Sequence, residues 1–202
     1  MTQARAAIDA VLARAAEVLS ARAAPEPREI GAAIAALPAP SRDYPPTLAP
    51  ACAHLDAALA LGVAATQPLI AAVAAARPYL AWRMMGREGF DDALRERIAY
   101  VELAGPEGAV AAPDLRVGLY LQAPGVDYPS HAHDAEELYL VLAGTAQWQR
   151  GWDGSDDPFA ALPPGKTRHH RAAEPHAMIT GDQPLLALWA WRGAIGGRYW
   201  FV

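Results

Sequence analysis

The densest group of metal-capable side chains lies between residues 131 and 139, which read His-Ala-His-Asp-Ala-Glu-Glu-Leu-Tyr. His131 and His133 are two residues apart, Glu137 follows four residues later, and Tyr139 comes two residues after that. Imidazole nitrogen and carboxylate oxygen together suit a divalent ion such as Zn, Fe, Mn, Ni or Co. Alternate residues of an extended strand share a face, so each pair can point in one direction. The spacing therefore predicts a metal site with a small turn between the pairs.

The residues that follow indicate where such a site would lie. The run from Leu138 to Leu142 is apolar and typical of a buried strand, and residues 143–145 are typical of a turn. Isolated histidines beside a strand are often only hydrogen-bonded surface groups. A carboxylate at this spacing, leading into an apolar strand, favours the metal site instead.

These donors resemble the first motif of the cupins, a family of small β-barrels, because they match its pattern HxHxxxE. The second cupin motif, G-x5-P-x-G-x2-H, supplies one more histidine. Gly165 and His176 fall on its end points, while Arg171 and Ala173 stand where the pattern has proline and glycine. The resemblance implies His176 as the fourth ligand. His169 and His170 are rival candidates; Pro175 and the apolar run around His176 favour that residue, because they would hold its imidazole at a barrel wall.

Within the cupins, the chain resembles the bacterial dimethylsulfoniopropionate (DMSP) lyases of cupin type. The resemblance rests on Tyr139, on Tyr128 five residues before His133, on the string Pro-His-Ala-Met at 175–178 and on a helical N-terminal half. It is dense in motifs from about residue 120 to 193 and only architectural before that.

This resemblance implies a carbon–sulfur lyase with one divalent ion and with Tyr139 as its base. Facing a dication, a tyrosine ionises below its usual pKa of about 10. The tyrosinate would remove the α-proton of bound DMSP, and the β C–S bond would break to give dimethyl sulfide and acrylate. Tyr139 packed against a ligand, with no catalytic role, is the alternative.

The other end of DMSP is a sulfonium cation, which aromatic faces attract. Tyr128 and Trp191 match substrate-pocket positions of the lyases. Trp189 shares a strand face with Trp191. Tyr120 is a lesser candidate because the sequence does not decide whether its side chain points into the barrel or away from it. Two further tryptophans, Trp148 and Trp152, are interpreted as core.

Two other functions compete with the lyase. Another metal-dependent cupin enzyme, an isomerase or a dioxygenase, would share the ligands and need no particular tyrosine. A non-catalytic small-molecule-binding cupin, as in sensor domains, is the third; the lack of a DNA-binding segment counts against it.

Composition narrows the class of protein. A chain of 202 residues with net charge −5 and no basic run does not indicate nucleic-acid binding. The single cysteine, Cys52, excludes an internal disulfide and is consistent with a reducing compartment. Charges scattered through residues 1–24 argue against a secretory signal, and no apolar run reaches the roughly 18–20 residues of a membrane span. We expect a soluble, cytoplasmic protein. The sequence does not determine the oligomeric state, and a homodimer is one candidate.

Periodicity predicts a helical region at residues 1–97 and, at residues 98–202, short strands that suit a barrel or a sandwich, so the fold class is mainly β. The resemblance implies that this second region is a cupin barrel (a double-stranded β-helix). The first helix carries an apolar stripe through residues 8–19, and Thr66 is expected to cap a later helix that has Pro68 in its first turn. His54 has a surface or packing role. The helical half would pack on the barrel or cap its mouth, with the proline-rich loop 38–50 as a candidate lid. Helices are expected at 1–24, 28–37, 48–61, 68–76 and 91–97, and strands at 100–103, 115–121, 138–142, 146–151, 177–180, 185–191 and 198–202.

Overall fold

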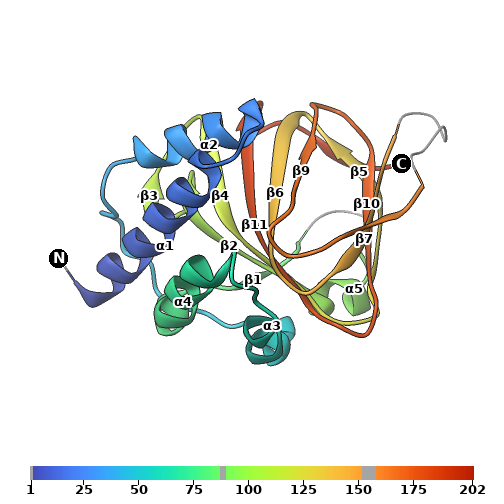
Figure 1. Ribbon diagram of the computed structural model, residues 1–202, viewed down its shortest axis with the longest axis horizontal. Coiled ribbons are helices and arrows are strands. Elements are labelled where there is room, and N and C mark those ends of the chain that lie inside the picture. The colour runs from blue at the N-terminus through green and yellow to red at the C-terminus, as the bar shows by residue number, and fades with distance from the viewer. Residues whose placement is uncertain (1, 87–89, 152–157) are drawn as a thin grey trace.

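The computed structural model describes residues 2–86, 90–151 and 158–202. Two sheets face each other, and helices from the first half of the chain lie on the outer side of the larger one (Figure 1). The expected β-rich fold with a helical N-terminal region is confirmed. Trp152 and the turn expected at residues 153–157 lie outside the described residues.

The helices gather at the start of the chain. They are α1 (Gln3–Ser20), α2 (Pro25–Ala35), the 3-10 helix η1 (Pro50–His54), α3 (Leu55–Ala60), α4 (Gln67–Ala76), the 3-10 helix η2 (Arg77–Tyr79) and α5 (Asp92–Arg97). The stripe predicted for the first helix is buried, and the Thr2 side chain accepts a hydrogen bond from the Arg5 N–H at its start. The first helix stops at Ser20, short of residue 24. The second begins three residues earlier than expected because Pro25 has the φ of a first helical residue and needs no N–H there.

The capping prediction for α4 is confirmed for the position of Thr66 but not for its hydrogen bond. Thr66 stands at the N-cap position of α4, but its side chain makes no capping hydrogen bond. Its hydroxyl donates instead to the Leu142 carbonyl, 2.8 Å away, in a fully buried position. A buried hydroxyl and a buried carbonyl both need partners, and each satisfies the other here. Thr66 therefore ties α4 to the sheet.

The strands form two sheets. The first has the order β1-β2-β4-β11-β6-β9, with β3 beside β2, and the second has the order β12-β5-β10-β7-β8. Their bounds are β1 (Arg83–Met84), β2 (Ile98–Gly105), β3 (Val110–Ala111), β4 (Leu115–Gln122), β5 (Asp127–His133), β6 (Ala135–Ala143), β7 (Ala146–Arg150), β8 (Ala160–Leu162), β9 (Thr167–His170), β10 (His176–Thr180), β11 (Leu185–Gly193) and β12 (Tyr199–Phe201).

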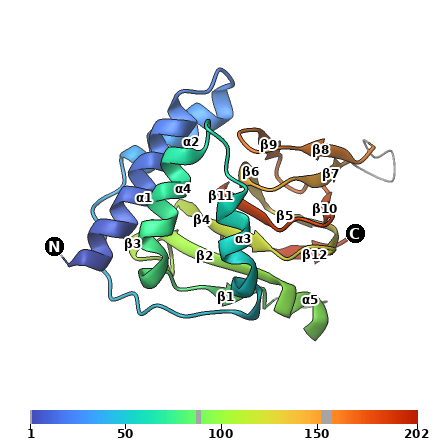
Figure 2. The same ribbon diagram turned by 60° about the horizontal axis from the view of Figure 1, so that its bottom comes forward.

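Alternation along β4, β6 and β11 separates two environments. One face of each strand, such as Val117 and Leu119 on β4, joins the hydrophobic cluster that contains α1 and α4. The opposite face, with Tyr120 on β4 and Tyr139 on β6, belongs to the cluster between the sheets. Figure 2 shows α1 and α4 side by side over the larger sheet. The sequence did not decide whether Tyr120 points inward or outward; in the structure it points inward, between the sheets.

The helical region packs on the barrel, which is one of the two expected arrangements, and loop 38–50 does not form a lid over the cavity. The helices pack on the outer face of the larger sheet, and none of the described residues of loop 38–50 lines the cavity between the sheets. Thr47 in this loop instead forms a parallel bridge with Ala81. Cys52 is half-buried and has no disulfide partner, and His54 is half-buried at the end of η1. Within the described residues, no helix has both the length and the apolarity needed to cross a membrane.

The predicted turn between the histidines and the carboxylate is the place where the chain changes sheets. β5 ends at His133 in the smaller sheet and β6 begins at Ala135 in the larger one, so only Asp134 lies between them. The Asp134 carboxylate accepts a hydrogen bond from the Arg198 N–H, 2.9 Å away. The change of sheet puts His133 and Glu137 on facing walls of one space, although they are close in sequence.

Candidate metal centre and cavity

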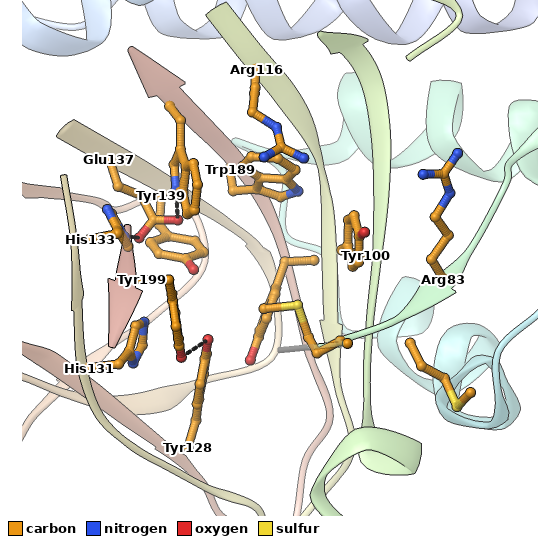
Figure 3. Close-up of a pocket in the computed structure, with 15 residues that line it drawn as sticks. Arg83, Tyr100, Arg116, Tyr128, His131, His133, Glu137, Tyr139, Trp189 and Tyr199 are labelled. Carbon is orange, nitrogen blue, oxygen red and sulfur yellow. Dashed lines mark hydrogen bonds and ion pairs between the residues drawn. The ribbon is translucent and has the colours of Figure 1, made fainter. Parts of the chain in front are cut away.

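Three of the predicted ligands converge between the sheets. His131 and His133 lie on β5, and His176 opens β10 as the register partner of His131. One ring nitrogen from each of the three lies within 4.8 Å of the others, and all three side chains are buried. Figure 3 shows His131 and His133 pointing into the space that Glu137 and Tyr139 also face.

Each of these imidazoles is held by a backbone carbonyl. Nδ1 of His131 lies 2.9 Å from the Pro129 oxygen, Nδ1 of His133 2.9 Å from the Ala135 oxygen, and Nδ1 of His176 2.9 Å from the Glu174 oxygen. A neutral imidazole that donates its Nδ1–H keeps the Nε2 lone pair free. Burial also lowers the pKa of His131 well below its ordinary value, which favours the neutral ring. These contacts orient the rings as they are oriented in metal-binding histidines.

Glu137 completes the donor set. Its Oε2 lies 3.0 Å from His133 Nε2 and 3.1 Å from His176 Nε2, and its Oε1 accepts the Trp191 indole N–H at 2.7 Å. Burial alone would raise the pKa of Glu137, but the two imidazoles outweigh it and lower the pKa well below its usual range. His176 Nε2 is buried and makes no hydrogen bond within the described residues. A buried carboxylate among inward-facing imidazole nitrogens fits a divalent ion by donor type.

The two rival histidines lie outside this donor group. His170, on β9, stacks on His176 with ring centroids 3.9 Å apart and is fully buried. His169 points the other way, is partly exposed, and has its Nε2 3.5 Å from Glu136 Oε2. Adjacent residues of a strand point to opposite faces, which is why they diverge. The structure therefore brings His176 into the donor group, and neither neighbour.

A cavity of about 270 Å³ opens beside these donors. One water needs about 10–15 Å³ of such space, so the cavity has room for a small metabolite. Its wall contains the predicted residues His131, His133, Glu137, Tyr139, Tyr120, Tyr128, Trp189 and Trp191. His176 belongs to the donor group but not to the cavity wall.

Tyr139 lies on the cavity wall two residues after Glu137, on the same strand face. Its ring packs against Trp148, with centroids 4.9 Å apart, and edge-on to Tyr120 at 5.8 Å. Burial, and then the Glu137 carboxylate, raise the pKa of Tyr139 well above its ordinary value. Ionising this phenol therefore requires positive charge in the cavity.

The aromatic candidates for substrate binding have different partners. Tyr128 stacks on His131 at 4.2 Å, and the Tyr120 hydroxyl lies 2.5 Å from Gln122 Oε1. The Trp189 indole N–H donates to the Leu119 carbonyl at 3.2 Å. Trp148 is in the core as expected, with a relative exposure of 1%, and does not line the cavity.

Several cavity residues were missed from the sequence. Tyr199 on β12 stacks on His131 with centroids 5.2 Å apart, and its hydroxyl is 3.0 Å from the Tyr128 hydroxyl. Its strand was expected, but periodicity alone does not say which strand lies beside it. Arg116 could have been predicted to line the cavity from the sequence. It lies an even number of residues from Tyr120 on β4, so both side chains are on the same face of the strand. The other missed wall residues are Arg83, Met84, Met85, Gly86 and Tyr100.

Two facing sheets that enclose three imidazoles and a carboxylate define a cupin-type barrel with a metal-capable centre. The model of one family, described as dimethylsulfoniopropionate lyase, matches residues 27–187. This chain therefore belongs to the DMSP lyase family, as the motifs indicated.

Individual relatives agree with this membership. The chain is 37% identical over 155 residues to "Putative dimethylsulfoniopropionate lyase DddL" of Cereibacter sphaeroides, covering 75% of this chain and 63% of that protein. It is 36% identical over 115 residues to the dimethylsulfoniopropionate lyase DddQ of Ruegeria pomeroyi, covering 55% and 54%. The matched part thus spans less than two thirds of each curated relative.

Solved structures match over nearly the whole chain. A chain from the crystal structures of the DMSP lyases RdDddP and RnDddQII superposes with a TM-score of 0.80 at 34% identity, covering 98% of this chain and 99% of that one. The crystal structure of DddQ from Ruegeria pomeroyi gives 0.79 at 29% identity, covering 98% and 96%.

Proposed function

We propose that this protein is a metal-dependent lyase that cleaves DMSP to dimethyl sulfide and acrylate by β-elimination. Membership of the DMSP lyase family supports this activity. The observation that carries it is the position of Tyr139, a buried phenol on the same cavity wall as the donors His131, His133 and Glu137. A base and a cation site that share one small cavity are what proton removal next to a carboxylate requires.

The ligands would be the three imidazoles of the donor group and Glu137. A divalent ion held by them would supply positive charge, which stabilises the negative charge that develops on the substrate and favours an ionised phenol. Tyr139 accepts the α-proton of DMSP at its phenolate oxygen. The electron pair of the broken C–H bond forms the Cα–Cβ double bond of acrylate. The Cβ–S bond breaks at the same time, and its electron pair leaves with sulfur as neutral dimethyl sulfide.

Aromatic side chains would hold the sulfonium end. Tyr128, Tyr120, Trp189 and Trp191 all line the cavity, and a desolvated aromatic face attracts a cation by about 0.5–2 kcal/mol. The burial of these rings also excludes water, which strengthens the attraction. The sulfonium loses its charge when the C–S bond breaks, so dimethyl sulfide would be held less tightly than the substrate.

Other parts of the assignment are proposals of the same kind. The ion is one of Zn, Fe, Mn, Ni or Co, because a mixed nitrogen and oxygen donor set accepts each of them. A cytoplasmic location is supported by the single cysteine, and a homodimer is retained as the candidate assembly. The division into a helical region at residues 1–97 and a barrel at residues 98–202 follows the distribution of α1–α5 and β2–β12.

The test is release of dimethyl sulfide into the headspace by purified protein, with and without a chelator. We expect release that stops on chelation and returns when a divalent ion is restored. Tyr139→Phe removes only the hydroxyl and should lower turnover by about 10²–10⁴-fold, the usual contribution of a general base. Its metal content should equal that of the wild type. Full turnover in this variant would remove Tyr139 from the mechanism.

The competing functions are other outcomes of the same experiment. Oxygen consumption with a diketone or thiol substrate, without release of dimethyl sulfide, would identify a dioxygenase. Binding of a small molecule with no turnover would identify a non-catalytic cupin. Both would share the ligands and would not depend on the Tyr139 hydroxyl.

A further inference from the structure

Three inward-facing residues form a row across neighbouring strands of the larger sheet. Trp191 on β11 is the register partner of Arg116 on β4 and, on its other side, of Glu137 on β6. Residues that lie directly opposite each other on one face of a sheet interact through their side chains. The row therefore connects Arg116, on the cavity wall, to the candidate metal ligand Glu137.

At one end of the row, Trp191 distinguishes the two oxygens of Glu137. The indole N–H donates to Oε1 at 2.7 Å, whereas Oε2 faces His133 and His176. The Trp191 ring also packs against the His133 ring, with centroids 4.3 Å apart. A carboxylate held through one oxygen cannot rotate freely, so the oxygen that faces the imidazoles stays the same.

At the other end of the row, Arg116 lies on the tryptophans. Its guanidinium carbon is 5.4 Å from the centre of the Trp191 ring and 5.7 Å from that of Trp189. Figure 3 shows the Arg116 guanidinium beside Trp189. Both distances are within the range of a cation–π interaction. A planar guanidinium can lie flat on an indole face while its N–H groups, which lie in the same plane, bind elsewhere; an ammonium group has no such plane.

A buried carboxylate fixes Arg116 in this position. Oε2 of Glu102 accepts hydrogen bonds from Arg116 Nε, at 2.8 Å, and from Arg116 Nη2. Its Oε1 accepts the Glu107 backbone N–H at 2.7 Å, and the Glu102 side chain has no exposed surface. Both oxygens of Glu102 are thus occupied. These hydrogen bonds are charge-assisted and shielded from water, so they hold the Arg116 side chain in place more firmly than a surface ion pair would.

We propose that Trp191 is a positioning residue that orients Glu137 toward the imidazoles, and that Arg116, clamped by Glu102, positions Trp191. This role rests on the proposed function for the metal site but concerns affinity for the ion, not the elimination chemistry. Trp191 then has a second task besides lining the substrate cavity. Partners that hydrogen-bond a metal ligand typically contribute about 10–100-fold to metal affinity.

The test measures metal affinity by competition with a chelator, starting from metal-free protein and using Zn²⁺ and Co²⁺ as probes. Trp191→Phe removes the N–H and keeps an aromatic ring beside His133. We expect about 10–100-fold weaker binding of both ions. The visible spectrum of the Co²⁺ form should also change, because the Glu137 carboxylate is free to turn.

The matched control is Trp189→Phe. Trp189 lies two residues before Trp191, on the same face of β11 and under the same guanidinium. Its N–H, however, donates to the Leu119 carbonyl. This change should leave metal affinity and the Co²⁺ spectrum as in the wild type. Equal affinity in Trp191→Phe and the wild type, or equal losses in the two tryptophan variants, would overturn the proposal.

The Arg116 step needs a double-mutant cycle. Arg116→Met combined with Glu102→Gln removes the cation without leaving an unpaired buried carboxylate. We expect this pair to weaken metal binding several-fold in the wild-type background and to have no further effect when Trp191→Phe is present. Additive losses would show that Arg116 does not act through Trp191. Should the pair fail to fold, Arg116→Lys, which keeps the charge but loses the planar fork, replaces it.

These outcomes are separate from those for the lyase. A wild-type protein that binds Zn²⁺ but releases no dimethyl sulfide refutes the proposed function and leaves the positioning role standing. A wild-type lyase whose Trp191→Phe variant binds the ion equally well refutes only the positioning role. A wild type without measurable affinity for either ion refutes the positioning role directly.

Discussion

Raising the pH should unfold the metal-free protein through three phenols of the cavity. Burial is the main cause that raises the pKa of Tyr120, Tyr128 and Tyr139 well above the ordinary value. In the unfolded chain each ionises with a pKa of about 10. A raised folded-state pKa contributes stability that is fully present below pH ~10 and is lost as the pH rises above it.

The size of this loss follows from proton linkage. At pH ~11, each phenol that stays neutral in the folded state but ionises on unfolding costs about 1.4 kcal/mol of unfolding free energy, and the three together cost about 4 kcal/mol. A domain of this kind has about 5–15 kcal/mol in total. The three phenols should therefore remove a large part of the stability within about one pH unit.

The assay is a pH titration that follows phenolate absorbance and far-UV circular dichroism together. We expect at least three phenols to ionise only in the cooperative transition in which the circular dichroism is lost. Adding a divalent ion should lower the pKa of one phenol, so that it ionises at a lower pH while the protein is still folded. Tyr139→Phe should abolish this ionisation step. Ionisation of every phenol near pH ~10 with the fold intact would refute the reasoning.

Three further predictions concern single side chains. His176→Ala should lose metal, whereas His169→Ala should keep it; undiminished metal content in the first, measured by elemental analysis, would remove His176 from the ligand set. Thr66→Val should lower the unfolding free energy by about 1–3 kcal/mol because it removes the buried hydroxyl that donates to the Leu142 carbonyl. Thr66→Ser, which keeps the hydroxyl, should recover most of this loss in urea denaturation. Gly105→Ala should cost about 3 kcal/mol or more, because a Cβ at this residue, whose φ is +147°, would overlap the Glu102 carboxylate. Gly181→Ala, where a Cβ meets open space, is the control, and equal denaturation midpoints would contradict the argument.

Local patterns predicted the elements and much of the donor set. Period-two alternation placed Glu137 with Tyr139, and Trp189 with Trp191, on shared faces, and both pairs line the cavity. This succeeds because the side of a strand on which a residue lies depends only on the pleat and the count of residues. The apolar stripe of the first helix was readable for the same reason, with a period of 3.6 residues instead of two.

Where local signals competed, the sequence by itself could not settle the outcome. Its context favoured His176 over His169 and His170, and the pairing of β10 with β5 is what puts His176 beside His131. Thr66 has the residue type and the place of a cap, but a buried carbonyl from β6 takes its hydroxyl. The loop at residues 38–50 has the composition of a lid and lies away from the cavity.

The sequence by itself determined which side chains of each strand face inward, because that property is local. Only the tertiary structure decided which inward faces meet. Tyr199 reaches His131, and Arg116 reaches Trp191, through pairings between strands that are far apart in the chain. Neither periodicity nor composition encodes such pairings directly, because they depend on how the whole sheet buries its two faces at once.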